Sequence, residues 1–128
     1  MATLILWGLW GFFAKILLAS LNWKPLFFFS TVASIFFAAI FLVVEKPSLT
    51  VNMQTCSAML VGLLGIGASM TFYYALESGK ASIVVPLTAM YPLVVVILAT
   101  VILGEKLSPA QGIGVVLAIV AVVLISIG

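Results

Sequence analysis

The fold is decided by residues 81–104, which read ASIVVPLTAMYPLVVVILATVILG and are apolar almost throughout. As a single helix this stretch is about 35 Å long, enough to cross the roughly 30 Å hydrocarbon core of a bilayer with some tilt. Pro86 and Pro92 each remove one backbone hydrogen bond, which frees the carbonyls of Ser82 and Thr88. Because lipid offers these carbonyls no other donor, the helix is expected to need polar neighbours or a water-filled cavity.

The composition of the whole chain is that of an integral membrane protein. Of its 128 residues, 66% are hydrophobic and 6% are charged, whereas soluble domains are about 25% charged. Asp, Arg and His are absent, so the chain has neither a usual catalytic base nor a metal-ligand cluster. We therefore expect no enzyme, no metal site and no cofactor. The net charge of +2 is too small and too dispersed for nucleic-acid binding.

Residues 1–128 are expected to form one all-α domain, a bundle of five transmembrane helices. Gly79 suits a helix C-terminus, and Ser108, Pro109 and Gln111 stand in capping-box order at the start of a helix. The single cysteine, Cys56, is expected to be a small buried residue. Each apolar segment is long enough to span a bilayer, and the expected helices are residues 3–21, 26–44, 56–77, 81–104 and 109–127.

The first segment places a charge within the membrane. Spacings of three, four and seven put Gly8, Gly11 and Lys15 on one helical face, and Trp7 lies beside it. A charge in mid-membrane costs roughly 2.5–3.5 kcal/mol on insertion scales, so such a residue usually faces the bundle interior or a cavity. The alternative is that the lysine stem reaches back to the nearer interface. Both interpretations remain open.

Small residues recur at helical spacing in the third and fifth segments. Gly62 and Gly65 lie in overlapping small-xxx-small pairs of the third segment, and Gly112, Gly114 and Ala118 lie in the fifth. Such pairs let helix backbones approach closely in a membrane. We interpret these five positions as helix-packing residues.

Polar side chains follow the small residues of the third segment. Ser69 and Tyr73 lie deep enough to line a site, whereas Tyr74 and Glu77 lie near the helix end, where an interfacial anchor is the favoured interpretation. The second segment is rich in phenylalanine, so lipid contact or simple packing is expected there. Its only polar groups are the small hydroxyls of Ser30, Thr31 and Ser34.

The chain resembles the EamA-type domain of the drug/metabolite transporter superfamily, whose usual members fuse two five-helix halves of opposite orientation. The resemblance implies one half of a ten-helix transporter fold. Position 121, often glycine in the family, is Ala121, and only one half is present. The motifs that carry the resemblance are Trp7-Gly8 with Lys15, residues 74–82, Pro92, the Gly104-Glu105 pair, Gln111 and Gly114.

The loop lysines give the chain little preference for one membrane orientation. In a five-helix topology Lys46 and Lys106 share one side, while Lys24 and Lys80 occupy the other, with Lys15 leaning toward the second side. Orientation follows the Lys/Arg asymmetry of short loops. The balance predicts either insertion both ways round, giving antiparallel dimers, or an orientation set by a partner or by insertion order.

The leading hypothesis is a half-size transporter of a small metabolite in the inner membrane, a dimer of two copies or of related half-transporter chains, working by alternating access. The kinks expected at Pro86 and Pro92 are either gating elements or static. The superfamily's small multidrug exporters carry an acidic residue in their first helix where this chain has Lys15, so the resemblance implies an anionic or zwitterionic substrate. The alternative function is a structural or accessory subunit of a larger membrane complex. The candidates for lining the site are Lys15, Trp7, Gly11, Ser69, Tyr73, Thr88 and Tyr91.

Overall fold

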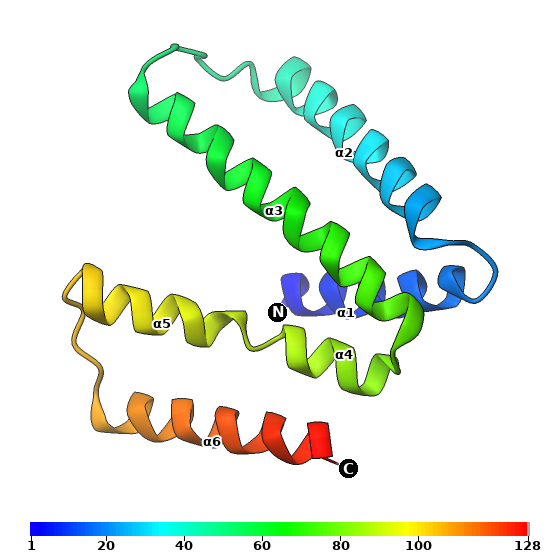
Figure 1. The fold of residues 1–128 in the computed structure, drawn as a ribbon. Helices are drawn as coiled ribbons and strands as arrows, with labels where there is room; N and C mark the ends of the chain where they lie inside the picture. The colour runs from blue at the N-terminus through cyan, green and yellow to red at the C-terminus, as the bar shows by residue number, and fades with distance from the viewer. Residues whose placement is uncertain (128) are drawn as a thin grey trace. The chain divides into compact units, whose positions relative to one another are not determined.

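The computed structural model describes residues 1–127, and every regular element in that range is a helix (Figure 1). The fourth expected helix is divided into two. The helices are α1 (Ala2–Leu18), α2 (Trp23–Glu45), α3 (Met53–Ser78), α4 (Ala81–Thr88), α5 (Tyr91–Ile102) and α6 (Pro109–Ile127).

Four apolar segments are long enough to cross a membrane: α2, α3, the α4–α5 stretch of 22 residues, and α6. The first helix, α1, is apolar but shorter, with 17 residues. At 1.5 Å per residue α1 measures about 26 Å, somewhat less than the hydrocarbon core. The described part of the chain thus has the five apolar helical segments that the sequence predicts.

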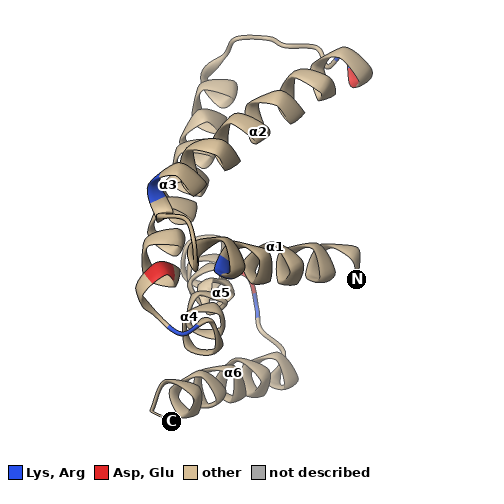
Figure 2. Ribbon diagram, turned by 90° about the vertical axis from the view of Figure 1, so that its right-hand side faces the viewer, with Lys and Arg blue, Asp and Glu red and all other residues tan. Residues whose placement is uncertain are grey.

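The helices form two compact units, Met1–Ser78 with α1 to α3 and a second unit that begins at Gly79 with α4 to α6. In the first unit α2 and α3 run antiparallel and diverge toward the loop at residues 46–52 (Figure 2). The buried side chains of this unit are few and gather where the end of α3 meets α1 and the start of α2. They belong to Ala14, Leu26, Tyr73 and Leu76.

The start of α2 is determined by side-chain caps. Asn22 accepts a hydrogen bond from the Lys24 N–H at 3.1 Å, so α2 begins at Trp23, three residues before the expected Leu26. Pro25 is tolerated because it lies in the first turn, where its missing N–H would have no partner within the helix.

The start of α3 is capped in a similar way. The Thr55 N–H donates to Asn52 Oδ1 at 2.9 Å and the Asn52 N–H donates to Thr55 Oγ1 at 2.8 Å. This reciprocal pair satisfies two backbone donors, so α3 begins at Met53 instead of the expected Cys56. Cys56 is exposed, so the expectation that it is buried is wrong. Cys56 lies in the first turn of α3, and no described element covers its side chain.

In the second unit the stretch at 81–104 is not one continuous helix. Pro86 lies inside α4, and Pro92 lies in the first turn of α5. Because Pro92 has no N–H for the carbonyl one turn earlier, α4 ends at Thr88 and a short turn at Ala89 and Met90 follows. The chain then continues as α5, and Pro92 lies in the first turn of that helix, where a proline is tolerated.

Two helix ends confirm the sequence interpretation. The Ser108 N–H donates to Gln111 Oε1 at 2.8 Å and the Gln111 N–H donates to Ser108 Oγ at 3.3 Å, which is the predicted capping box at the start of α6. Gly79 directly follows the last residue of α3, as expected.

The charged residues lie at helix ends and in the connections between helices (Figure 2). Lys15 lies in the last turn of α1, and Glu77 lies in the last turn of α3. Since charges are costly within a bilayer, their position at helix ends fits a membrane-spanning chain.

Candidate functional site

A tryptophan–tyrosine pair joins α1 to α3. Trp10 Nε1–H donates to the Tyr73 hydroxyl oxygen at 3.0 Å, and the two rings are tilted with centroids 5.5 Å apart. The indole also stacks on Phe72, with centroids 4.9 Å apart and an interplanar angle of 19°. Tyr73 is 2% exposed. A buried tyrosine hydroxyl needs a hydrogen-bond partner, and the indole N–H of Trp10, a residue that is itself 42% exposed, supplies it.

Lys15 makes a second link between the same helices. Its Nζ donates to the backbone carbonyl of Leu76 at 2.7 Å. Leu76 lies in the last turn of α3, where carbonyls have no partner within the helix and carry the negative end of the helix dipole. The ammonium group of Lys15 therefore stabilises the C-terminus of α3 and holds α1 against it.

Glu77 links α3 to the start of α2. Its Oε1 accepts a hydrogen bond from the Trp23 N–H at 3.1 Å, and the Trp23 ring meets Tyr74 edge-on with centroids 5.8 Å apart. A carboxylate is favourable at a helix N-terminus, where backbone N–H groups lack partners. Glu77 and Tyr74 thus position the beginning of α2, a role beyond the interfacial anchoring expected of them.

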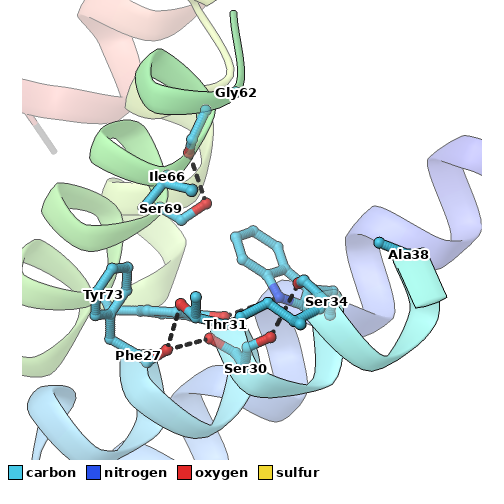
Figure 3. Close-up of a pocket in the computed structure, with 12 residues that line it drawn as sticks. Phe27, Ser30, Thr31, Ser34, Ala38, Gly62, Ile66, Ser69 and Tyr73 are labelled. Atoms are coloured by element: carbon cyan, nitrogen blue, oxygen red, sulfur yellow. Dashed lines mark hydrogen bonds between the residues drawn. The ribbon is translucent and has the colours of Figure 1, made fainter. Parts of the chain in front are cut away.

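Beyond these links α2 and α3 enclose a groove of about 580 Å³ (Figure 3). Its wall is a mixture of aromatic rings, small residues and hydroxyl groups, and none of the described residues that line it is charged. From α1 and α3 come Trp10, Gly62, Gly65, Ile66, Ser69 and Tyr73, and from α2 come Phe27, Ser30, Thr31, Ser34, Ile35 and Ala38.

The hydroxyl groups of the groove are bonded to their own helices. Ser30 and Thr31 each donate to the Phe27 carbonyl at 2.9 Å, and Ser34 donates to the Ser30 carbonyl at 2.9 Å. Ser69 on the facing helix donates to a carbonyl one turn back at 3.0 Å (Figure 3). In this arrangement the single hydrogen of each hydroxyl is bonded within its own helix, so each hydroxyl presents oxygen lone pairs to the groove.

A sequence model of the EamA-like transporter family matches residues 1–127. The chain belongs to the EamA-like transporter family. It is also 36% identical over 126 residues to the uncharacterised protein MJ1333.1 of Methanocaldococcus jannaschii, an alignment that covers 96% of this chain and 90% of that protein. No solved structure shows significant similarity to the chain.

Membership of this family confirms the resemblance seen in the sequence, since EamA-like proteins are transporters of the drug/metabolite superfamily and not enzymes. With its long apolar helices, the EamA-like chain is a multi-pass integral membrane protein surrounded by a lipid bilayer. The five-helix membrane bundle predicted from the sequence is likewise confirmed.

The first unit of the EamA-like chain brings some of the candidate lining residues together. Ser69 and Tyr73 lie on the wall of the groove. Gly11 is buried in α1, and the Trp7 side chain is 57% exposed on the same helix. Lys15, in the last turn of α1, reaches the end of α3 with its Nζ and is not among the residues that line the groove. The groove therefore combines only part of the set expected from the sequence.

The second unit holds the remaining candidates. Thr88 ends α4 and donates its hydroxyl hydrogen to the carbonyls of Val84 and Val85 at 2.8 and 3.0 Å. Tyr91 is the first residue of α5 and is 51% exposed. A smaller hollow of about 320 Å³ lies between α5, the following loop and α6. Its lining includes four residues named from the sequence, Pro92, Gln111, Gly114 and Ala118.

The glycines interpreted as helix-packing residues have open space around them. A Cβ built on Gly62, Gly65, Gly112 or Gly114 meets no described atom within 4 Å. Their small size is therefore not required by the contacts in either unit. It leaves room for a further helix, for lipid or for a ligand, and at Gly62 and Gly65 that room is the groove.

Sequence reasoning missed Trp10 and undervalued the hydroxyls of α2. A signal for the latter exists, because Phe27, Ser30, Thr31, Ser34 and Ala38 recur at helical spacing on one side of a helix rich in phenylalanine. The interpretation of α2 as a lipid-contacting or simply packed helix omits this stripe, which lines the groove.

Proposed function

We propose that this EamA-like chain is a half-size transporter of a small metabolite in the cytoplasmic membrane, working by alternating access as a dimer. The observation that carries the proposal is the family match over residues 1–127, combined with a groove that has polar groups within the apolar helices. A transporter needs a site of this kind away from the membrane surface, where a solute can exchange water for protein groups.

The second half of the transporter would be another copy of this chain or a related half-transporter chain. Five spanning segments are an odd number, so two copies in the same orientation cannot reproduce an inverted repeat. Two copies in opposite orientations can. The loop lysines support this arrangement, because two of them fall on each side of the membrane in a five-segment topology.

Lys15, Ser69, Tyr73, Thr88 and Tyr91 remain our proposal for residues that contribute to the transport path. The expectation of an anionic or zwitterionic substrate depended on the Lys15 ammonium as a substrate contact. At least one of its hydrogens is already donated, to the carbonyl at the end of α3. We therefore base the site on the groove, with Ser69 and Tyr73 as its central polar residues.

The orientation of the chain tests the dimer. A cysteine added at the C-terminus, in a Cys56→Ser background that removes the exposed native thiol, is labelled with a membrane-impermeant maleimide in intact and in opened cells. Insertion both ways round predicts partial labelling in intact cells and complete labelling after opening. Labelling that is all or none in intact cells would exclude the antiparallel homodimer and leave the related half-transporter chain.

Purification tests the transporter against the accessory-subunit alternative. A transporter is expected to purify as a dimer, and its thermal unfolding temperature should rise with a bound solute, because a ligand that binds only the folded state stabilises it. Stoichiometric co-purification with other membrane subunits, without stabilisation by any solute, would favour the scaffold function.

A further inference from the structure

We infer that the groove between α2 and α3 binds a small, uncharged solute through that solute's hydrogen-bond donors, such as amide N–H or hydroxyl groups. This inference rests on the proposed transport function and names the class of substrate for it. The observation that carries it is the direction of the hydrogen bonds in the groove wall.

The serine and threonine hydroxyls present acceptors to the groove. Ser30, Thr31, Ser34 and Ser69 each donate their single hydrogen to a carbonyl of their own helix, at 2.9 to 3.0 Å. What remains of each group is a pair of oxygen lone pairs. Because Ser30, Thr31 and Ser34 come from α2 and Ser69 comes from α3, a solute between the helices meets acceptors on both sides (Figure 3).

The polarity of the wall selects against anions. A fully ionised carboxylate or phosphate carries only acceptors, so at the serine and threonine oxygens of the wall it would face lone pairs without donors to satisfy it. No described lining residue is a lysine that could offset its charge. Among the described lining residues, Tyr73 is the one whose hydroxyl accepts a hydrogen bond, from Trp10 Nε1, and it keeps a hydrogen that can be donated.

The same wall selects against cations. No carboxylate lies among the described lining residues, and the carboxylate of Glu77 caps the start of α2. An unpaired charge at membrane depth is costly. The rings of Trp10, Phe27 and Tyr73 provide apolar surface for the body of a solute, which leaves a neutral molecule with donor groups as the best match.

Four benzene derivatives of similar size test this class: benzamide, N,N-dimethylbenzamide, benzoate and benzylammonium. They are titrated by ligand-observed NMR against the protein in lipid nanodiscs, with empty nanodiscs as the blank for partitioning. Benzamide alone is neutral and carries N–H donors, so we expect it to bind with an affinity about tenfold higher than the other three, as one to two unmatched hydrogen bonds require.

Matched variants show whether binding occurs in the groove. Ser69→Ala should weaken benzamide binding about fivefold, whereas Ser57→Ala, which removes a similar hydroxyl bonded to its own helix outside the groove, should not. Gly65→Leu should abolish binding by filling the groove, while Gly67→Leu should leave it unchanged. An added Cβ has open space at both glycines, so neither exchange begins from a clash.

Several results would overturn the inference. Equal affinity for benzamide and its dimethyl analogue would show that the groove does not recognise N–H donors. Stronger binding of benzoate or benzylammonium would show that the groove prefers a charged class of substrate. Absence of saturable benzamide binding would show that the groove is no site for this class. Dimer crosslinking at Gly65→Cys, but not at Gly67→Cys, in the Cys56→Ser background would show that a second copy fills the groove.

These failures are distinguishable from failure of the transport function. A preference for benzoate or benzylammonium in the groove leaves a half-size transporter with a different substrate class. The transporter itself fails only if the chain purifies as a subunit of a larger complex and no solute stabilises it.

Discussion

Replacing Lys15 by methionine should destabilise the first unit by about 2 kcal/mol. Methionine keeps an unbranched apolar stem of four atoms but loses the terminal donor that reaches the Leu76 carbonyl at 2.7 Å. A hydrogen bond to a charged group contributes about 1.5–3 kcal/mol, and a cation at a helix C-terminus contributes about 0.3–1 kcal/mol. The two terms overlap because they describe one contact, and ordering a lysine side chain offsets part of both.

The loss of this hydrogen bond should cost more than the same loss at an exposed lysine. Leu76 is 0% exposed and Lys15 is half-buried, so water does not readily replace the ammonium at the carbonyl. Lys15→Arg keeps a charged donor and should recover at least half of the loss. Lys24→Met, at an exposed position near the start of α2, is the matched control and should stay within about 0.5 kcal/mol of the wild type.

The assay is reversible unfolding in mixed micelles, followed by helix circular dichroism at one fixed protein concentration, since the stability of a dimer depends on concentration. A Lys15→Met protein as stable as the wild type would refute the capping argument, as would an equal loss for Lys24→Met. Transport per folded protein is measured in parallel. If it survives in Lys15→Met, the lysine positions α1 on α3 and does not contact the substrate.

Three further predictions concern separate contacts. In a double-mutant cycle, Trp10→Phe and Tyr73→Phe should show a coupling energy of about 0.5–1.5 kcal/mol in the same unfolding assay, and additivity would mean that their 3.0 Å hydrogen bond contributes nothing. Glu77→Ala should lower the free energy of unfolding by about 1 kcal/mol through loss of the cap on α2, whereas an unchanged value would contradict that role. Gly104→Ala should destabilise the protein by about 1–2 kcal/mol, because the φ of Gly104 is +68°. Gly114→Ala, in a helix with open space for a Cβ, should be neutral or stabilising by up to about 1 kcal/mol. Thermal unfolding of both variants measures these changes, and a change of the same sign in both would contradict the backbone argument.

The difference between the two units bears on how the chain would work in a membrane. In the first unit, hydrogen bonds from Trp10 and Lys15 and to Glu77 connect the helices. In the second unit the apolar stretch is broken at Ala89 and Met90, between α4 and α5. A break of this kind concentrates backbone adjustment at a few residues, which is where hinge motions in transporters are usually found. Pro86 and Pro92 therefore remain our proposal for the kinks of a moving element.

The sequence by itself determined the apolar segments, the helical fold and several helix ends. These follow from local chemistry, because a helix in lipid must satisfy its backbone groups within its own segment or with nearby caps. The capping box of Ser108 and Gln111 needs only a three-residue spacing, and it is present. At Pro92 the sequence predicts a freed carbonyl at Thr88 and a kink, because proline has no N–H, but it does not predict the break that the structure has at Ala89 and Met90.

The tertiary structure alone decided which residues of different helices meet. Trp10 bonds to a residue 63 positions away, and Lys15 bonds to a carbonyl 61 positions away. In a soluble protein the apolar stripe of each helix reveals its inner face. Here the helices are apolar on nearly all sides, since lipid and protein neighbours are both apolar, so the sequence does not reveal the rotation of each helix about its axis. That rotation is what turns the hydroxyls of α2 toward α3 and creates the groove.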